Sequence, residues 1–347
     1  MRSGGKPLKK KRGCAWRILG LLMVLGLVAV LAVDYVFNLR STLVFLAFRD
    51  SRQPLEVRLG GSGSWKPVSA LTVAELDRAL VRRDEDNGIT WRTLVLRREA
   101  RTWGQRLAGF LVRETVNVIE ITPANYQFQT SFKDGFALTT AKERLNTERA
   151  AFAITANFRD PAGKPLGLVV HEGTQRNSTF PAWTGYFFVK AGKPWFGPKS
   201  LFEETPGVLQ EASQGYPSLM KNHTVFSYVD LPSTRYFDGN RVTYRALAGM
   251  KQNGNIVFIL SGTGGVMNVS EVTALAQRLN VQHATLLDGG RALQYSLKLH
   301  GAARHFTAFN TLIDFGSEML ELQRSPVYIV ARPTAVVPAS PPTVTTP

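Results

Sequence analysis

The hydrophobic pattern of the chain begins with a segment that is apolar on every face. Residues 18–33 (ILGLLMVLGLVAVLAV) carry no charge. With Arg17 reaching back to the interface, the segment 15–33 meets the lower limit of a membrane-spanning helix, about 17 residues. A buried core helix fits poorly, because the segment is apolar on all faces and lies at an extreme terminus. We therefore predict a transmembrane signal anchor over 15–33, and a cleaved signal peptide is the alternative.

The charges beside this segment predict its orientation. Seven Lys and Arg side chains precede the first acid, Asp34, and basic flanks stay in the cytoplasm. We expect residues 1–14 to be a basic cytoplasmic tail and the protein to cross the inner (plasma) membrane once. The main domain then lies outside the cytoplasm, which in a bacterium is the periplasm.

The segment after the anchor, residues 34–115, is expected to hold a tether and the N-terminal part of the folded domain. Residues 35–48 are moderately apolar but contain Asn38 and Arg40, so they form either a tether or a first packed element. Helical spacing of apolar residues predicts a helix in residues 69–80, with Thr72 as its cap. Residues 90–99 alternate as in a strand.

From Val116 to residue 332 the pattern is mainly that of short strands. This part of the chain is predicted to hold many strands and hairpins and only two helices. Thr140–Glu143 and Asn268–Glu271 have the spacing of a capping box at the start of these helices. Strands are expected at 116–128, 151–173, 180–189, 241–262 and up to 288. The segment 241–262 is expected to be a hairpin with Asn253–Gly254 as its turn. This arrangement predicts one α+β domain with a mixed or antiparallel sheet rather than a doubly wound fold. The Pro/Thr-rich residues 333–347 are expected to be disordered.

Composition changes this picture in two respects. The chain has a single cysteine, Cys14, which excludes an intrachain disulfide. The net charge is +16, and it is still +9 without the seven charges before Asp34. A basic chain can bind nucleic acid or an anionic polymer. No zinc-finger spacing, RNA-binding signature or helical stripe of Arg and Lys is present, so we expect no nucleic-acid partner.

Two glycine-rich corners are candidates for chemistry. Residues 261–265 (SGTGG) connect a predicted strand to a helix, where backbone N–H groups can turn toward a phosphate. A tight turn that needs positive φ is an equally good interpretation. Asp288 ends the next predicted strand and is followed by Gly289 and Gly290. A carboxylate beside a buried strand is costly unless it is paired or functional, although Asp-Gly also forms hairpin turns.

These two corners are joined by one predicted helix, so they could lie at the same edge of a sheet. Other chemistries find no support in the sequence. The five histidines show no metal-binding spacing and there is no thiolate cluster, so a zinc site is not expected. A serine-hydrolase elbow, Gly-x-Ser-x-Gly, is also absent.

The order of motifs over residues 117–330 resembles the phosphodiester glycosidase family. Its opening strand is similar to VNVIEITP, its Ala-Ile-Asn-Gly-Gly-Phe-Phe motif to AITANFRD, and its Gln-Ser-Gly-Pro segment to QGYPSLM. Its Arg-Thr-Ala-Ile-Gly strand is similar to YRALAG, and its Leu-Asp-Gly-Gly ending to LLDGG. The family hydrolyses sugar-1-phosphodiesters. The resemblance thus implies a hydrolase that acts on a phosphate-containing glycan or glycolipid of the envelope.

The resemblance also implies site residues. The catalytic candidates are Asp288, Asn157 and Arg245. The substrate-binding candidates are Gly289, Gly290, Ser261, Gly262, Gln214, Glu271 and Arg291. We expect no metal ligands and no organic cofactor, and a requirement for a divalent cation is left open.

Three departures from the family pattern define an alternative. Both glycines after Asn157 are replaced, by Phe158 and Arg159, and Arg291 stands where the family tends to carry serine. The Gln-Ser-Gly-Pro segment contains Tyr216. Either the pocket takes a different, more anionic ligand, or the domain is a catalytically inactive module that binds an envelope polymer. A third hypothesis is a structural partner in a membrane complex.

Overall fold

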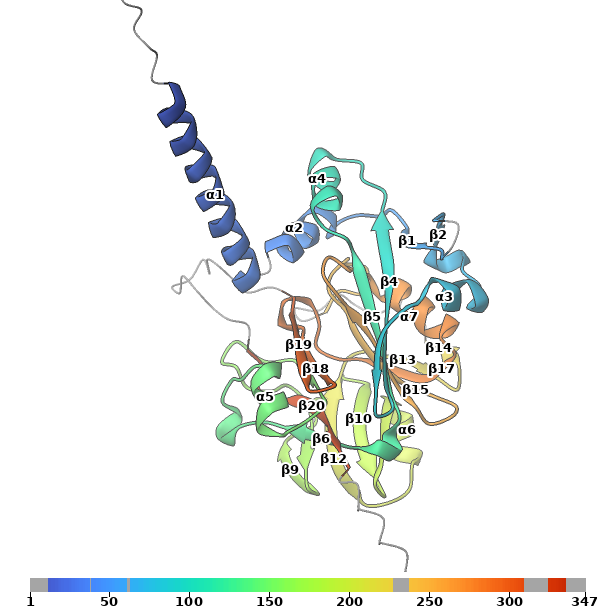
Figure 1. The fold of residues 1–347 in the computed structure, drawn as a ribbon. Helices are drawn as coiled ribbons and strands as arrows, with labels where there is room; N and C mark the ends of the chain where they lie inside the picture. The colour runs from blue at the N-terminus through green and yellow to red at the C-terminus, as the bar shows by residue number, and fades with distance from the viewer. Residues whose placement is uncertain (1–11, 38, 61–62, 227–236, 309–323, 335–347) are drawn as a thin grey trace, which may run out of the picture.

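The computed structural model describes residues 12–37, 39–60, 63–226, 237–308 and 324–334. It shows the predicted α+β fold, in which every strand pair among these residues is antiparallel. The strands of this domain form three sheets (Figure 1). Most of the predicted basic tail and of the Pro/Thr-rich tail lies outside the described residues.

The largest sheet has ten strands and contains segments from both halves of the chain. Its order is β14-β13-β17-β15-β16-β5-β4-β1-β2, with β3 paired to β4. The strands are β1 (Leu55–Arg58), β2 (Trp65–Pro67), β3 (Val81–Asp86), β4 (Ile89–Arg98), β5 (Thr115–Ile121), β13 (Ser218–Lys221), β14 (Thr224–Val225), β15 (Ala246–Lys251), β16 (Ile256–Ser261) and β17 (Val281–Leu286). The chain before residue 116 therefore completes the same sheet as the predicted domain.

Two five-stranded sheets accompany it. The first has the order β11-β10-β12-β8-β9 and the second β19-β18-β7-β20-β6. Their strands are β6 (Tyr126–Ser131), β7 (Phe152–Thr155), β8 (Val169–His171), β9 (Thr174–Asn177), β10 (Gly185–Lys190), β11 (Lys193–Pro198), β12 (Leu209–Gly215), β18 (Gln294–Leu299), β19 (Ala302–Thr307) and β20 (Tyr328–Pro333).

Residues that alternate along the strands build two cores on opposite faces of the large sheet. Ala246 and Phe258 belong to a cluster shared with the two smaller sheets. Leu247 and Val257, their chain neighbours, belong to a second cluster that α3 (Val73–Ala79) and α7 (Val269–Arg278) cover. Because side chains alternate between the faces of a strand, this division also decides which face each candidate site residue occupies.

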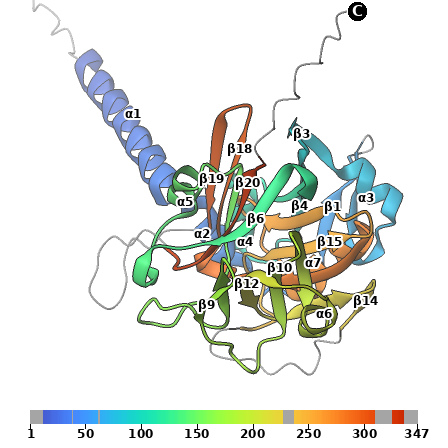
Figure 2. The ribbon, with the colours of Figure 1, turned by 90° about the horizontal axis from the view of Figure 1, so that it is seen from below.

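Helix α1 (Arg12–Phe37) projects away from the domain in both views (Figures 1 and 2). It contains the segment Trp16–Asp34, which is long and apolar enough to cross a membrane and has none of its window buried. Helix α2 (Leu39–Phe48) follows at once and packs into the core through Val44 and Phe48, both almost completely buried. The segment 35–48 therefore contains a packed element rather than a free tether.

Local capping signals were reliable guides to the helices. The capping residues expected at α3, α5 (Ala141–Thr147) and α7 each form a reciprocal capping box, with Thr72, Thr140 and Asn268 as N-caps. The expected Asn253–Gly254 hairpin joins β15 to β16. Helix α4 (Trp103–Leu111), with its own Thr102–Gln105 capping box, was not predicted. Helix α6 spans Lys199–Glu204, in the segment where the sequence showed no regular pattern.

Candidate active site

The corner that follows β17 is held by backbone hydrogen bonds to two other strands. The N–H of Asp288 donates to the carbonyl of Ala156 at 3.1 Å. The N–H groups of Leu287 and Gly290 donate to Ala246 at 2.9 Å and to Tyr244 at 2.7 Å. The backbone of Asp288 therefore lies beside that of Asn157, which follows Ala156. It lies opposite Arg245, which stands between Tyr244 and Ala246. The three catalytic candidates thus come together at one edge of the sheet.

The carboxyl group of Asp288 is almost completely enclosed, since the residue is 6% exposed. Burial raises its pKa from 3.8 to about 8, because the charged form loses its hydration. The charge of Arg159 and a hydrogen bond from the N–H of Gly289 act in the opposite direction. At neutral pH this group is mainly protonated, so it can donate a proton.

Arg245 supplies a buried positive charge to the same corner. Its Nε donates to the carbonyl of Met267 at 3.3 Å, and Nη2 donates to those of Asp238 and Arg241 at 2.7 and 2.8 Å. The guanidinium also lies 5.5 Å from the centre of the Phe237 ring. Burial lowers its pKa to about 10. Within the described residues no carboxylate lies within 4.0 Å of this guanidinium, so its field is not neutralised by an ion pair.

The side chain of Asn157 is occupied by internal hydrogen bonds. Its Nδ2 donates to the carbonyls of Leu166 and Leu168 at 3.0 and 3.2 Å, and its Oδ1 accepts from Ser213 Oγ at 2.6 Å. In this arrangement the side chain fixes the loop before β8 against β12. The geometry is that of a positioning residue rather than of a group that binds sugar hydroxyls.

Gln214 has a similar arrangement. Its Oε1 accepts from the N–H groups of Leu168 and Phe180, and its Nε2 donates to the carbonyls of Phe180 and Trp183 and to Tyr186 Oη, all within 2.9–3.0 Å. The side chain is fully buried. It joins the segment around Phe180 to β12, close to Asn157.

The glycine loop at residues 261–265 lies at the same edge as Asp288, as the sequence suggested. The N–H groups of Gly262 and Gly265 donate to Thr115 and Gly262, and Gly264 has φ +66°. Ser261 Oγ accepts from the N–H of Arg245 at 2.8 Å. Of the two interpretations offered for the loop, these contacts favour the tight turn, and Ser261 serves to hold Arg245.

Glu271 is directed toward the N-terminal part of the chain. Arg98 holds both of its carboxylate oxygens, and the N–H groups of Asn268 and Leu55 donate to them as well. The carboxylate is thus engaged in linking α7 to β4 and β1.

The remaining candidates shape the corner itself. A Cβ on Gly289 would lie 2.7 Å from the carbonyl oxygen of Tyr244, and Gly290 has φ +58°. Gly289 is therefore explained by the close approach of two backbone segments, and Gly290 by its positive φ. Arg291 is exposed, within the short 3-10 turn Gly290–Ala292.

An aromatic cluster next to this corner was not predicted from the sequence. Trp183 contacts Phe158, Phe180 and Tyr216, with ring centres 4.9, 5.1 and 6.4 Å apart, and Tyr216 contacts Phe237 at 5.0 Å. The cluster connects the residue after Asn157 to the ring beside Arg245. These residues are scattered over 80 positions of sequence, so no spacing could have revealed them; the bulky residues at 158 and 216 were the available signal.

The described residues thus combine a buried protonated acid, an arginine without an ion pair and an aromatic wall in an α+β domain. No group of three or more His, Cys, Asp or Glu side chains suited to a metal ion occurs among them. Residues 148–311 match the family model for phosphodiester glycosidases, the family that the sequence motifs resemble.

Comparison with solved structures gives the same fold. The catalytic domain of zebrafish N-acetylglucosamine-1-phosphodiester alpha-N-acetylglucosaminidase, auto-inhibited by its pro-peptide, is similar with a TM-score of 0.53 and 11% identity, over 83% of this chain and 93% of that chain. A hypothetical protein from Synechocystis was also found, with a TM-score of 0.48 and 13% identity, over 73% of this chain and 63% of that chain. No curated protein matches the sequence.

Proposed function

We propose that the protein hydrolyses a sugar-1-phosphodiester within a phosphate-containing glycan or glycolipid on the outer side of the plasma membrane. The observation that carries the proposal is the buried Asp288, whose pKa burial raises to about 8 and on which the charge of Arg159 acts. Breaking a glycosidic bond requires a proton donor for the leaving oxygen, and a raised pKa is what such an acid needs.

In the proposed reaction, water attacks the anomeric carbon while the bond from that carbon to the bridging oxygen breaks. The phosphomonoester leaves with the proton of Asp288, the attacking water loses a proton to solvent, and Asp288 regains a proton from solvent. The guanidinium groups of Arg159 and Arg245 attract the negative phosphate, and this attraction strengthens as water is excluded. Most of the aromatic cluster around Trp183 is buried, and its exposed member, Phe180, offers an apolar surface for a sugar ring.

The alternative is a binding module without catalysis on the same fold. It is favoured by one observation, that Phe158 replaces a glycine of the family motif and packs on Trp183 at 4.9 Å. The ring occupies space that the family leaves open, so the pocket accepts a smaller or differently oriented ligand. In both functions the N-terminal helix anchors the protein and an envelope phosphoglycan is its partner.

The test uses the full chain purified in detergent and a panel of sugar-1-phosphodiesters, with and without divalent cations. Asp288→Asn removes the proton donor with little change of shape. Asp134→Asn, at an exposed position, is the matched control. Release of free sugar by the wild type and by the control, but not by Asp288→Asn, supports hydrolysis. A folded protein that binds phosphoglycans and releases no sugar from any member of the panel supports the binding module.

A further inference from the structure

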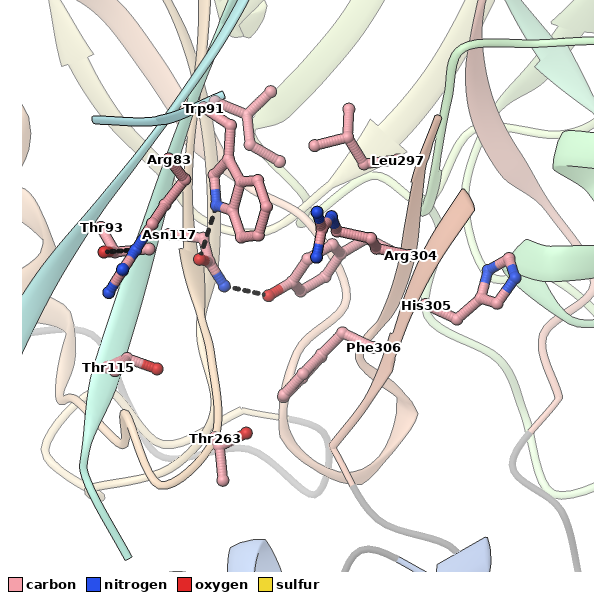
Figure 3. A pocket seen from close by; sticks show the side chains of 12 residues that line it. Arg83, Trp91, Thr93, Thr115, Asn117, Thr263, Leu297, Arg304, His305 and Phe306 are labelled. Carbon is pink, nitrogen blue, oxygen red and sulfur yellow. Dashed lines mark hydrogen bonds between the residues drawn. The ribbon is translucent and has the colours of Figure 1, made fainter. Parts of the chain in front are cut away.

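A separate cavity of about 470 Å³ opens between β3–β5 and the β18–β19 hairpin (Figure 3). Thr115, Asn117 and Ile119 of β5 line it, whereas Val116 and Val118 point to the opposite face of the sheet. Arg245, the neighbour of Ala246 in sequence, directs its side chain to that opposite face. The cavity is therefore distinct from the candidate active site, although both lie near the same edge.

A chain of hydrogen bonds fixes the inner wall of this cavity. Trp91 Nε1 donates to Asn117 Oδ1 at 2.8 Å, and Asn117 Nδ2 donates to Tyr295 Oη at 2.6 Å (Figure 3). Tyr295 Oη in turn donates to the carbonyl of Ser261 at 3.2 Å. The Tyr295 ring stacks on Phe306 with centres 4.8 Å apart. These contacts hold the wall in one shape before any ligand arrives, which lowers the entropy cost of binding.

The rim of the cavity carries positive charge without matching negative charge. The guanidinium of Arg304 lies 5.0 Å from the centre of the Trp91 ring, and Arg83 Nε donates to Thr93 Oγ1 at 2.7 Å. Neither arginine forms an ion pair with a carboxylate of the described residues. Both guanidinium groups thus keep donors that an oxyanion can use.

We propose that this cavity binds an anionic saccharide unit, with its phosphate or carboxylate at Arg304 and Arg83. The side chains of Thr115 and Thr263 line the same cavity, and their hydroxyl groups form no hydrogen bond with the described residues. These hydroxyl groups can therefore form hydrogen bonds with the hydroxyls of a sugar. The partly buried Phe306 supplies an apolar surface. A glycan bearing several negative charges could then contact the protein at two places, on the two faces of one sheet.

Calorimetric titration of the full chain in detergent tests this proposal, with glucose-6-phosphate as the probe and glucose and inorganic phosphate as comparisons. We expect Arg304→Gln and Arg83→Gln to weaken glucose-6-phosphate binding at least tenfold. Arg82→Gln is the matched control, because Arg82 is the preceding residue of β3 and already pairs with Glu85.

Two results would overturn the proposal. One is probe affinity that stays unchanged in both Arg304→Gln and Arg83→Gln, in proteins whose melting temperatures match the wild type. The other is inorganic phosphate binding as tightly as glucose-6-phosphate, which would make the cavity a simple anion site. Because the proposal does not depend on turnover, a lack of hydrolase activity leaves it standing, and loss of probe binding leaves the hydrolase proposal standing.

A second inference rests on the outer face of α4. Trp103 and Phe110 are 76% and 86% exposed, and their spacing of seven residues places them on one stripe of the helix. Arg106 lies between them on the same stripe, and Leu111 and Arg113 continue the exposed surface. Large exposed apolar side chains alternating with arginine are typical of helices that lie in a membrane interface.

The position of α4 relative to the anchor supports this interpretation. The inner face of α4 packs on α2, where Gln105 Nε2 donates to the carbonyl of Ala47 at 3.1 Å. Helix α2 begins two residues after the end of α1. Helices α1 and α4 also lie on the same side of the domain (Figure 1). A membrane crossed by α1 would therefore pass close to the exposed stripe.

We infer that α4 lies on the outer surface of the bilayer, with Trp103 and Phe110 among the lipid headgroups and Arg106 and Arg113 at lipid phosphates. This inference rests on the proposal that α1 spans the membrane. A single-cysteine variant tests it: Phe110→Cys in a Cys14→Ser background, labelled with an environment-sensitive dye in nanodiscs that contain anionic lipid. Val208→Cys is the matched control, since Val208 is an equally exposed apolar residue, 79% accessible, outside α4.

The dye at position 110 should shift to shorter emission wavelength and be quenched by lipids with a spin label near the headgroup, while the dye at position 208 should not. Equal emission and equal quenching at the two positions would contradict the inference. Incorporation of the protein into nanodiscs tests the anchor independently, so failure of the anchor and failure of the α4 contact are distinguishable.

Discussion

Arg98 and Glu271 are 173 residues apart in the sequence and form a bidentate ion pair, with Nη1–Oε1 and Nη2–Oε2 distances of 2.7 and 2.6 Å. The arginine side chain is 1% exposed and the glutamate side chain 12%. The pair fixes the end of β4 to the N-terminus of α7, which leads to the strand that carries Asp288. Two parts of the chain that look separate in the sequence are thus held together at a buried point.

Replacing Arg98 by Met should destabilise the protein by about 3–5 kcal/mol, because Glu271 would be left buried without its partner. The change also removes a positive charge that acts on the buried Glu114. Thermal unfolding of the full chain in detergent measures the effect. Arg97→Met, which removes an exposed pair with Glu56, is the control and should cost less than about 1 kcal/mol. Similar losses of stability in both variants would show that the buried ion pair contributes no more to stability than the exposed one.

Glu114→Gln should stabilise the protein at alkaline pH. Burial raises the pKa of Glu114 from 4.5 to about 8, so the folded state holds a proton that the unfolded state releases. Stability is therefore lost between pH 4.5 and 8 as the pH rises. The glutamine variant lacks this loss, so its advantage in melting temperature should be larger at pH 8 than at pH 4.5. An advantage independent of pH would contradict the assignment.

Asp288→Asn should separate stability from activity. Because the pKa of Asp288 is raised from 3.8 to about 8, the same sign argument predicts a gain of stability on the order of 2–4 kcal/mol at pH 7. If Asp288 is the proton donor, hydrolysis by the wild type should fall as the pH rises through about 8. Melting curves and a pH–rate profile measure the two effects. A rate that continues to rise above pH 9 would exclude Asp288 as the acid.

Asn157→Ala should destabilise the protein by about 2–3 kcal/mol. The change leaves three hydrogen-bonding partners unsatisfied, Leu166 O, Leu168 O and Ser213 Oγ. These contacts position the loop and do not touch the reacting atoms. Asn157→Asp keeps an oxygen that accepts from Ser213 but lacks the amide donor, so it should restore only the bond with Ser213. Chemical denaturation compares the two variants. A variant at full stability with lost substrate binding would instead assign Asn157 a direct role at the ligand.

The sequence predicted the features that depend on local signals. Capping boxes at Thr72, Thr140 and Asn268 and the Asn253–Gly254 turn carry their partners within three or four residues, so their outcome follows from short-range chemistry. The corner at Asp288 was also predictable, because the acid interrupts an apolar run. By contrast, the partners of Glu271 and Asn157 come from distant strands, and side-chain direction there depends on the pairing of the whole sheet.

The continuity between α1 and α2 has a consequence for where the protein can act. Helix α2 packs into the core through Val44 and Phe48. No long linker therefore separates the domain from α1. If α1 lies in the bilayer, the dimensions of the domain set the height of the Asp288 corner above the membrane surface. Under the proposed function, a substrate that lies farther from the membrane than this height would be out of reach of the corner.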